Sequence, residues 1–233
     1  MDAAERLIVA LDVPRLSPAL EIARAIRGEV RWVKVGLELF TAAGPDAVQS
    51  LRALGFKVFV DLKLHDIPNT VEGAVRAAAH LGADCLTLHA SGGIPMMRAA
   101  REARDASRGS MRLLGVTVLT SQDGTEFPEI YRSADVEERV ARLASAAAEA
   151  RLDGVVCAAH ELERLGTSLP PAFHRVTPGI RPGGAPAGDQ ARTATPREAV
   201  ARGATQIVVG RPVTRAPDPA RAAREILASI EGV

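Results

Sequence analysis

The sequence predicts a single (β/α)8 barrel, and three observations support this fold. Short runs rich in Val, Ile and Leu alternate with Ala-rich amphipathic segments, and eight such pairs follow one another along the chain. The chain has 233 residues, a length that α/β barrels commonly fill as one domain. No linker or low-complexity tract divides it, so residues 1–233 are expected to form one domain.

The eight apolar runs are predicted to be strands. Near-continuous apolar runs of this length are typical of strands that are buried on both faces, as in a parallel sheet. In chain order they are residues 7–12, 32–36, 57–61, 85–89, 113–119, 154–157, 175–178 and 206–210. Eight similar units favour a closed barrel over an open doubly wound sheet.

The amphipathic segments between the strands are predicted to be helices, and several of them end at a glycine. They are residues 19–28, 46–55, 71–82, 94–107, 135–151, 160–166, 196–203 and 219–231. The longest irregular stretch, residues 179–193, follows the seventh strand and is rich in Gly and Pro. A loop this long in a compact domain is usually functional, so we expect it to form a lid over the active face.

The composition argues against several classes of partner. Hydrophobic residues make up 47% of the chain and charged residues 24%, as in ordinary globular proteins. The net charge of +1 provides no basic field for nucleic acid or anionic lipid. Residues 1–6 show neither a signal peptide nor a membrane span, so a cytoplasmic location is expected. Cys85 and Cys157 lie far apart in the sequence and are interpreted as buried thiols.

Polar residues stand where the predicted strands end, which is the end of a barrel that carries catalytic residues. They are Asp12, Lys34, Asp61, Lys63, His89, Thr120, Thr177 and Arg211, with Pro178 and Gly210 next to the last two. Gly210 allows close backbone approach, and the guanidinium of Arg211 suits a phosphate group. Phosphate sites in such barrels typically follow the seventh and eighth strands. We therefore expect an anionic group of the ligand to bind there.

The few lysines are informative because only three of the 29 basic residues, Lys34, Lys57 and Lys63, are not arginine. An ammonium group can give up a proton, whereas arginine cannot. Asp61 and Lys63 are two residues apart, so they point to one side if the strand geometry continues. Two opposite charges about 4 Å apart attract by roughly 4 kcal/mol at an effective dielectric constant of about 20, which keeps a lysine protonated. The alternative is a purely structural ion-pair network.

Residues 61–70, DLKLHDIPNT, continue from the third strand into a helix. Pro68 suits an early helical position, and Asp66 and Thr70, four residues apart, would share one face of the turn. No second histidine stands at a metal-binding spacing from His65, so a packing or hydrogen-bonding role is favoured for it.

At these residues the chain resembles the bacterial, single-domain orotidine 5'-phosphate decarboxylases. The resemblance covers essentially the whole chain and is highly specific. It rests on residues 11–14, 34–36, 61–71, 116–121, 177–181, 189–190 and 209–212. The stretch 183–188, rich in Gly, Ala and Pro, departs from the family and puts the exact contacts of the lid in question.

The resemblance implies a carboxy-lyase that converts orotidine 5'-phosphate to UMP and CO2, the last step of de novo pyrimidine synthesis, without a metal or an organic cofactor. Lys63 would protonate C6 of the pyrimidine, with Asp61 beside the substrate carboxylate and Lys34 completing the charge network. Asp66 and Thr70 would reach into the site of a second subunit, which makes the enzyme a homodimer. The resemblance further implies a set of substrate-binding residues: Asp12 and Lys34 at the ribose hydroxyls, Thr120 at the pyrimidine amide, Arg181, Gln190, Gly210 and Arg211 at the phosphate, and Pro178 as a further contact.

Two other functions compete with this interpretation. Related barrels that act on sugar phosphates with magnesium share the Asp-x-Lys-x-x-Asp pattern, but they place an acidic residue on the second strand, where this chain has Lys34. A cation beside a metal ion is electrostatically unfavourable. A barrel that binds a nucleotide without catalysis is the second competitor.

Overall fold

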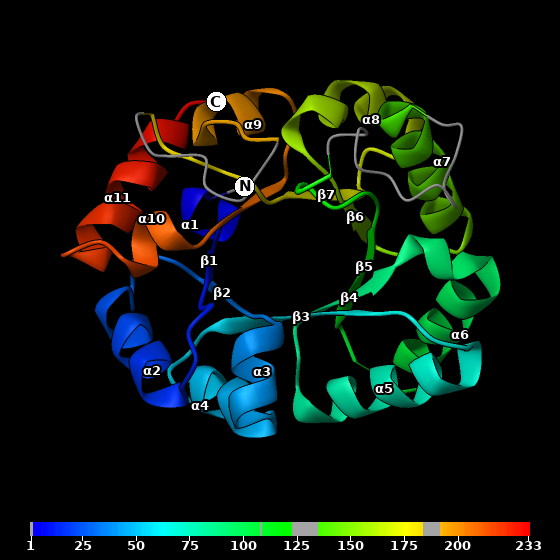
Figure 1. Cartoon of the computed structure of the whole chain (residues 1–233), viewed down its shortest axis with the longest axis horizontal. Coiled ribbons are helices and arrows are strands. Elements are labelled where there is room, and N and C mark those ends of the chain that lie inside the picture. Colours follow the sequence, from blue (N-terminus) through cyan, green and yellow to red (C-terminus); the bar gives the residue numbers. More distant parts are fainter. Residues whose placement is uncertain (1, 108, 123–134, 184–191) are drawn as a thin grey trace.

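Eight strands of the computed structural model, which describes residues 2–107, 109–122, 135–183 and 192–233, close into one barrel (Figure 1). Each strand pairs in parallel with the next, and β8 returns to β1. They are β1 (Leu7–Ala10), β2 (Trp32–Val35), β3 (Lys57–Leu64), β4 (Cys85–His89), β5 (Arg112–Val116), β6 (Gly154–Val156), β7 (His174–Thr177) and β8 (Gln206–Val209). The predicted fold is confirmed.

Helices surround the barrel (Figure 1). In the described residues they are α1 (Ala3–Arg6), α2 (Leu16–Ala25), α3 (Leu37–Ala43), α4 (Pro45–Ala53), α5 (Pro68–Leu81), α6 (Gly93–Ala106), α7 (Val136–Glu149), α8 (Leu162–Ser168), α9 (Pro196–Ala201), α10 (Arg211–Thr214) and α11 (Pro219–Ile230), with short 3-10 helices at η1 (Ala90–Gly92) and η3 (Ala159–Glu161). Local sequence sets their ends. Pro68 begins α5 and Gly82 ends it with a φ of 81°. Asp218 caps α11 by accepting a hydrogen bond from the Arg221 N–H at 2.9 Å.

Two apolar layers hold the barrel together, because alternate side chains of each strand point to opposite faces. On β1, Ile8 faces the inside of the barrel, whereas Leu7 and Val9 face the surrounding helices. The inner layer contains Ile8, Ala10, Trp32, Phe59, Cys85, Leu114, Val176 and Val208. These side chains fill the barrel, so a ligand has to bind at one of its ends.

A polar cluster around Trp32 lies at the N-terminal end of the barrel. The indole Nε1 of Trp32 donates a hydrogen bond to Glu5 at 2.8 Å. The Nζ atom of Lys57 lies 3.0 Å from Oε1 of Glu5 and 5.4 Å from the centroid of the Trp32 ring. Lys57 therefore lies at the end of the barrel opposite to the other two lysines.

The structure departs from the expected elements at a few places that shape the site. β3 runs three residues past its predicted end, to Leu64, and its pairing with β4 is irregular between Val60 and Leu64. β5 ends earlier than predicted, at Val116. The helices α3 and α10 follow β2 and β8 directly, and they are too short to show a helical period in the sequence.

Candidate active site

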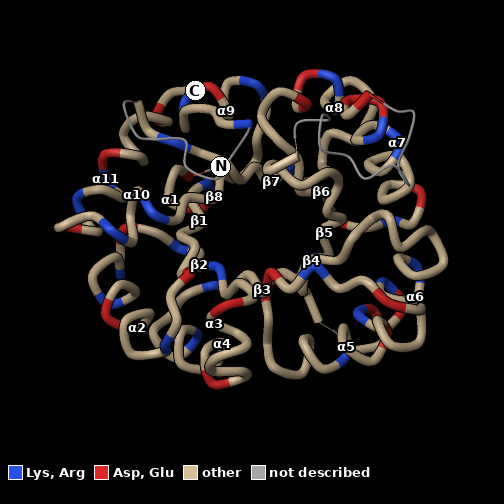
Figure 2. Tube along the Cα trace, viewed as in Figure 1, with Lys and Arg blue, Asp and Glu red and all other residues tan. Residues whose placement is uncertain are grey.

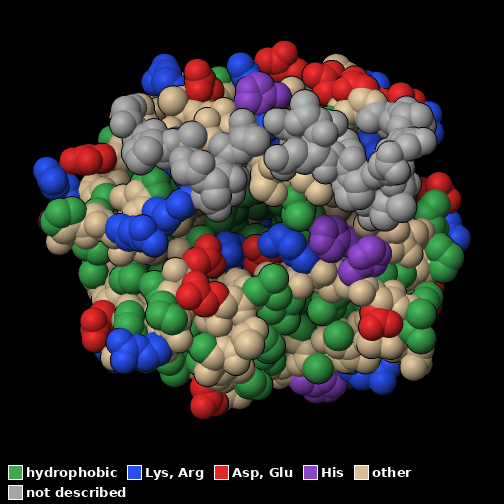
Figure 3. Space-filling model, viewed as in Figure 1, with side chains coloured by type: hydrophobic (Ala, Val, Ile, Leu, Met, Phe, Trp, Pro, Cys, Tyr) green, Lys and Arg blue, Asp and Glu red, His purple; other side chains and the backbone are tan. Residues whose placement is uncertain are grey.

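A cavity of about 480 Å³ opens at the C-terminal ends of the strands. Its lining includes inner-layer side chains such as Ala10, Phe59 and Val208, beneath a polar wall. Figure 3 shows charged side chains of both signs in the central hollow of this face, and Figure 2 shows that such residues stand close to β2 and β3. A cavity of this size accommodates a small organic molecule.

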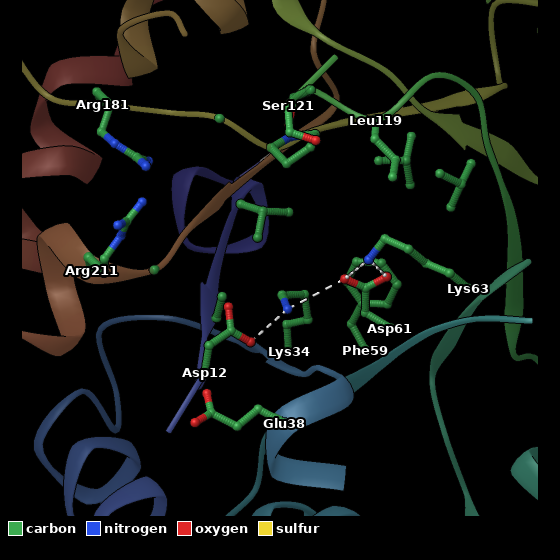
Figure 4. A pocket seen from close by; sticks show the side chains of 18 of the residues that line it. Asp12, Lys34, Glu38, Phe59, Asp61, Lys63, Leu119, Ser121, Arg181 and Arg211 are labelled. Carbon is green, nitrogen blue, oxygen red and sulfur yellow. Dashed lines mark hydrogen bonds and ion pairs between the residues drawn. The ribbon is translucent and has the colours of Figure 1, made fainter. Parts of the chain in front are cut away.

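Four charged side chains form a row along one wall of the cavity (Figure 4). Lys34 Nζ lies 2.9 Å from Oδ1 of Asp12 and 3.4 Å from Oδ2 of Asp61. Lys63 Nζ donates to both carboxylate oxygens of Asp61 at 2.9 Å. The order Asp12, Lys34, Asp61, Lys63 alternates in sign.

The middle of this row is buried, and its ion pairs keep it charged. Burial raises the pKa of Asp61, but the charges of Lys34 and then Lys63 outweigh it and leave the pKa below the ordinary value. Burial lowers the pKa of Lys34, but the charges of Asp61 and then Asp12 raise it above the ordinary value. Only about a tenth of each of these two side chains is exposed, whereas 28% of the Lys63 side chain is exposed. The Lys63 side chain is thus the more accessible of the two lysines, and a ligand in the cavity can reach it.

Thr87 on β4 orients both ends of the Asp61–Lys63 pair, and sequence analysis missed it. Its hydroxyl donates to Asp61 Oδ1 and accepts from the backbone N–H of Lys63, both at 2.9 Å. Lys63 has a φ of 51°, a left-handed conformation that is uncommon for non-glycine residues. A threonine inside a strand predicted to be buried indicates that its hydroxyl needs partners, but the sequence does not show which residues these are.

Gly36 leaves room for the first pair of the row. A Cβ atom at this position would lie 2.6 Å from Oδ1 of Asp12 and 2.7 Å from Nζ of Lys34. Any larger residue would push these two side chains apart. Gly36 is the last residue of the predicted strand 32–36, but the sequence gave no sign of this close approach.

The opposite end of the cavity is basic. Arg181, after β7, and Arg211, at the start of α10, extend toward one another there, away from Lys63 (Figure 4). Thr120, Pro178 and Gly210 also line the cavity. The structure therefore brings most of the predicted site residues together around one space. Gln190 lies outside the described residues, as do all of residues 184–191 of the predicted lid.

Comparison with known proteins shows which family this chain belongs to. A profile of the family described as "Orotidine 5'-phosphate decarboxylase / HUMPS family" matches residues 5–226. The chain belongs to this family. Its members here include a protein from Anaeromyxobacter dehalogenans named orotidine 5'-phosphate decarboxylase, 52% identical over 230 residues, which cover 99% of this chain and 100% of the relative.

Two further family members extend the comparison. A protein of the same name from Nitratidesulfovibrio vulgaris is 51% identical over 97% of this chain and 98% of its own length. The crystal structure of orotidine 5'-phosphate decarboxylase from Lactobacillus acidophilus matches with a TM-score of 0.86 and 37% identity, covering 98% of this chain and 100% of that one. The resemblance stated from the sequence is confirmed, and the chain is an enzyme of the carboxy-lyase class.

Asp66 and Thr70 do not join this family site within one chain. Both are exposed, and neither lines the cavity. Oδ1 of Asp66 accepts a hydrogen bond from the N–H of Ile67 at 2.6 Å, which holds the carboxylate at the turn before α5. Their position leaves both side chains available to another molecule.

Other titratable groups near the site have packing roles. His65 packs against His89, with ring centroids 5.4 Å apart, which agrees with the packing role favoured from the sequence. Cys85 and Cys157 are buried as predicted, and burial raises the pKa of Cys157 to about 12. In the described part of the chain, His, Cys, Asp and Glu side chains form no group of three or more that could hold a metal ion. None of the helices described there combines the length and apolar character needed to cross a membrane.

Proposed function

We propose that this chain converts orotidine 5'-phosphate to UMP and CO2 as the last step of de novo UMP synthesis. We further propose that Lys63 protonates C6 directly, without a metal or an organic cofactor. The observation that carries this proposal is the ammonium of Lys63, bound to both oxygens of a buried carboxylate and partly exposed to the cavity. Family membership supports the overall reaction, and the charge row supports the role of the lysine.

The reaction needs this arrangement because the electron pair left at C6 has no carbonyl group to delocalise it. The bond between C6 and the carboxyl carbon breaks, CO2 departs, and the electron pair on C6 takes a proton from Lys63. The resulting amine regains a proton from water before the next turnover. Charges that are already in place stabilise such an anion without reorganisation, and a proton donor in contact with C6 quenches it. Asp61 orients the donor, because both of its carboxylate oxygens accept hydrogen bonds from Lys63.

The remaining contacts with the substrate are assigned from the residues at the two ends of the cavity. Arg181 and Arg211 bind the phosphate, assisted by the backbone at Gly210 and by Gln190. Asp12 and Lys34 contact the ribose hydroxyls between the two ends. Thr120 and Pro178 lie beside the pyrimidine, where the hydroxyl of Thr120 contacts the amide edge. Binding energy from the distant phosphate then assists the reacting carbon.

The active unit in this proposal is a homodimer, in which Asp66 and Thr70 of each subunit complete the site of the other. Their exposure supports this arrangement. Two large apolar side chains at the C-terminal ends of β2 and β3 are also exposed: Leu37, at the start of α3, by 57%, and Ile67, next to Asp66 in the chain, by 65%. Exposed apolar groups beside a site favour association with another protein surface. The cytoplasmic location and the lack of nucleic-acid or membrane partners stay predictions.

The competing function, a magnesium-dependent reaction on a sugar phosphate, fits the charge row less well. The Nζ atom of Lys34 occupies the space between the carboxylates of Asp12 and Asp61, at 2.9 and 3.4 Å. A divalent ion at these carboxylates would have to displace this ammonium or lie against it. Orotidine 5'-phosphate therefore fits the site better than a metal-bound sugar phosphate.

The decisive experiment adds orotidine 5'-phosphate to purified, chelator-treated protein and follows the loss of the orotate absorbance. We expect full turnover without added metal. Activity that disappears with the chelator and returns with magnesium would support the metal-dependent competitor. Tight UMP binding without any decarboxylation would support a nucleotide sensor instead.

A further inference from the structure

A buried ion pair stands behind the wall of the cavity that carries Thr120. It joins Glu161, at the end of η3, to Arg192, at the start of the described segment before α9. The Glu161 side chain is 3% exposed and that of Arg192 is 14% exposed. Neither residue lines the cavity.

Arg192 connects three loops that follow neighbouring strands. One guanidinium nitrogen binds Glu161, whose other carboxylate oxygen accepts from the backbone N–H of Ala158, after β6, at 2.7 Å. The second nitrogen, Nη2, donates to the carbonyl oxygens of Val118 at 3.2 Å and Leu119 at 3.1 Å, after β5. The backbone N–H of Arg192 donates to the carbonyl oxygen of Thr120 at 3.3 Å. The same side chain thus holds the Thr120 wall against the loop after β6.

The same segment also holds Arg181. Two residues beyond Arg192, the carbonyl oxygen of Ala194 accepts from the N–H of Arg181 at 2.9 Å. The N–H of Ala194 donates to the carbonyl oxygen of Gly179 at 3.4 Å, and Ala194 forms a β-bridge with Ile180. Arg192 and Ala194 therefore connect Thr120, at one side of the cavity, to Arg181, at the basic end.

Stability alone does not account for this pair. Removing two charges from water is costly, and apolar side chains of similar volume often stabilise a protein as well or better. A forked guanidinium with fixed partners instead holds backbone segments in one geometry. We therefore expect the ion pair to fix the position of Thr120 relative to Arg181 and not to add to the stability of the fold.

We propose that Arg192 and Glu161 are positioning residues that couple the grip on the substrate phosphate to the contact with the pyrimidine. The inference rests on the proposed function, because it assigns the phosphate to Arg181 and the base to Thr120. With the pair intact, binding of the phosphate places the base correctly. Without it, the two contacts form independently, and the phosphate contributes less to the reaction.

The test compares kcat/KM for orotidine 5'-phosphate with kcat/KM for orotidine, the nucleoside without phosphate, in Arg192→Met, Arg192→Lys and Glu161→Gln. We expect Arg192→Met to lower kcat/KM for the nucleotide by about 10- to 100-fold, the scale of a small misplacement at a reacting centre. The loss with the nucleoside should be several-fold smaller. Arg192→Lys should recover part of the loss, because it retains the charge but not the fork.

A matched control is available at the other end of the barrel. Arg104, whose side chain is 13% exposed, also joins a carboxylate, Asp153, and a backbone carbonyl, that of Met111. Arg104→Met should lower the melting temperature but leave the ratio of the two kcat/KM values within about twofold of wild type, because distant sites act independently.

Each outcome decides the question. Equal losses with both substrates in Arg192→Met, or a ratio no different from that of Arg104→Met, would show a merely structural pair and overturn the proposal. If Arg192→Met does not fold, an unchanged ratio in both Arg192→Lys and Glu161→Gln overturns it. Wild-type protein inactive on orotidine 5'-phosphate refutes the proposed function, which the same assay reveals separately.

Discussion

The ammonium of Lys63 contacts both carboxylate oxygens of Asp61, two residues earlier, although the chain between them does not follow regular strand geometry. Lys63 has a φ of 51°, and its N–H is held by Thr87. An uncommon backbone conformation at a functional group persists only where its surroundings enforce it. The contact between the two side chains thus depends on β4 as well as on β3.

Replacing Lys63 by alanine should separate binding from catalysis. In Lys63→Ala the basic end of the cavity is intact, so UMP should still bind, as titration calorimetry can measure. Decarboxylation should fall by at least about 10²- to 10⁴-fold, because the proton donor is gone. Lys57→Ala, at the opposite end of the barrel, is the matched control and should retain activity. Substantial turnover by Lys63→Ala would refute the role of this lysine.

Replacing Lys34 by methionine should destabilise the fold. Asp61 would stay buried with Lys63 and Thr87 as partners but with one cation fewer. Breaking a buried pair from one side typically costs a few kcal/mol, so we expect the free energy of unfolding in urea to fall by about 3 kcal/mol. Arg98→Met removes an exposed pair with Glu149 and should cost less than about 1 kcal/mol. Equal losses in the two variants would contradict the importance of the buried row.

Mixing two inactive variants should restore activity if the sites are shared between subunits. Lys63→Ala and Asp66→Ala place their defects in different halves of a shared site, so each mixed dimer regains one intact site. Random exchange of equal amounts makes about half of the dimers mixed, and about a quarter of all sites active. The measurement is decarboxylation after subunit exchange.

The control for this mixing experiment combines Lys63→Ala with Asp61→Asn. These two residues contact each other within one chain, so every site in a mixed dimer keeps one defect. We expect no recovery. If exchange is demonstrated by mass spectrometry and the first mixture also stays inactive, the shared site is refuted.

Stability should decrease below neutral pH because of His89. Burial lowers its pKa below the ordinary 6.5, and the nearby His65 and Lys63 lower it further, against the opposing charge of Asp61. As the pH falls from 6.5 through the folded pKa, the unfolded chain binds the proton more readily, so the free energy of unfolding declines. The carboxyl group of Asp61, whose pKa is lowered from the ordinary 3.8, affects the free energy of unfolding only at a pH below that value.

Urea unfolding between about pH 7.5 and pH 5 checks this prediction, because the unfolded chain takes up this proton around the ordinary pKa of 6.5. His89→Asn removes the titrating group and should make the dependence on pH shallower. His174, whose pKa burial also lowers, contributes in the same direction. An identical slope in wild type and His89→Asn would contradict this assignment.

Much of the fold could be predicted because the barrel repeats one local pattern. Strands buried on both faces produce apolar runs, and these marked the eight strands to within a few residues in most cases. The largest misses, α3 and α10, are short helices next to the cavity. Their geometry depends on the neighbouring strand ends and not on a periodic pattern of their own, so tertiary contacts determine them.

The site was predictable where residue chemistry alone reveals it. Lys63 stood out because lysine is rare in this chain, and Asp61 stood out because it lies two residues before Lys63. Their contact is confirmed. Thr87, Gly36 and Arg192 were missed for a different reason. Each acts through a neighbour from another part of the chain, and such long-range contacts leave no local pattern in the sequence.

The distribution of lysines has a practical consequence for handling the protein. Only Lys57 exposes much of its side chain, 44%, while Lys34 exposes 10% and Lys63 28%. Among side-chain amines, a surface coated with an amine-reactive linker would therefore capture mainly Lys57. Molecules immobilised in this way would stand with the cavity facing the solution, and prior incubation with nucleotide would shield Lys63 from the linker.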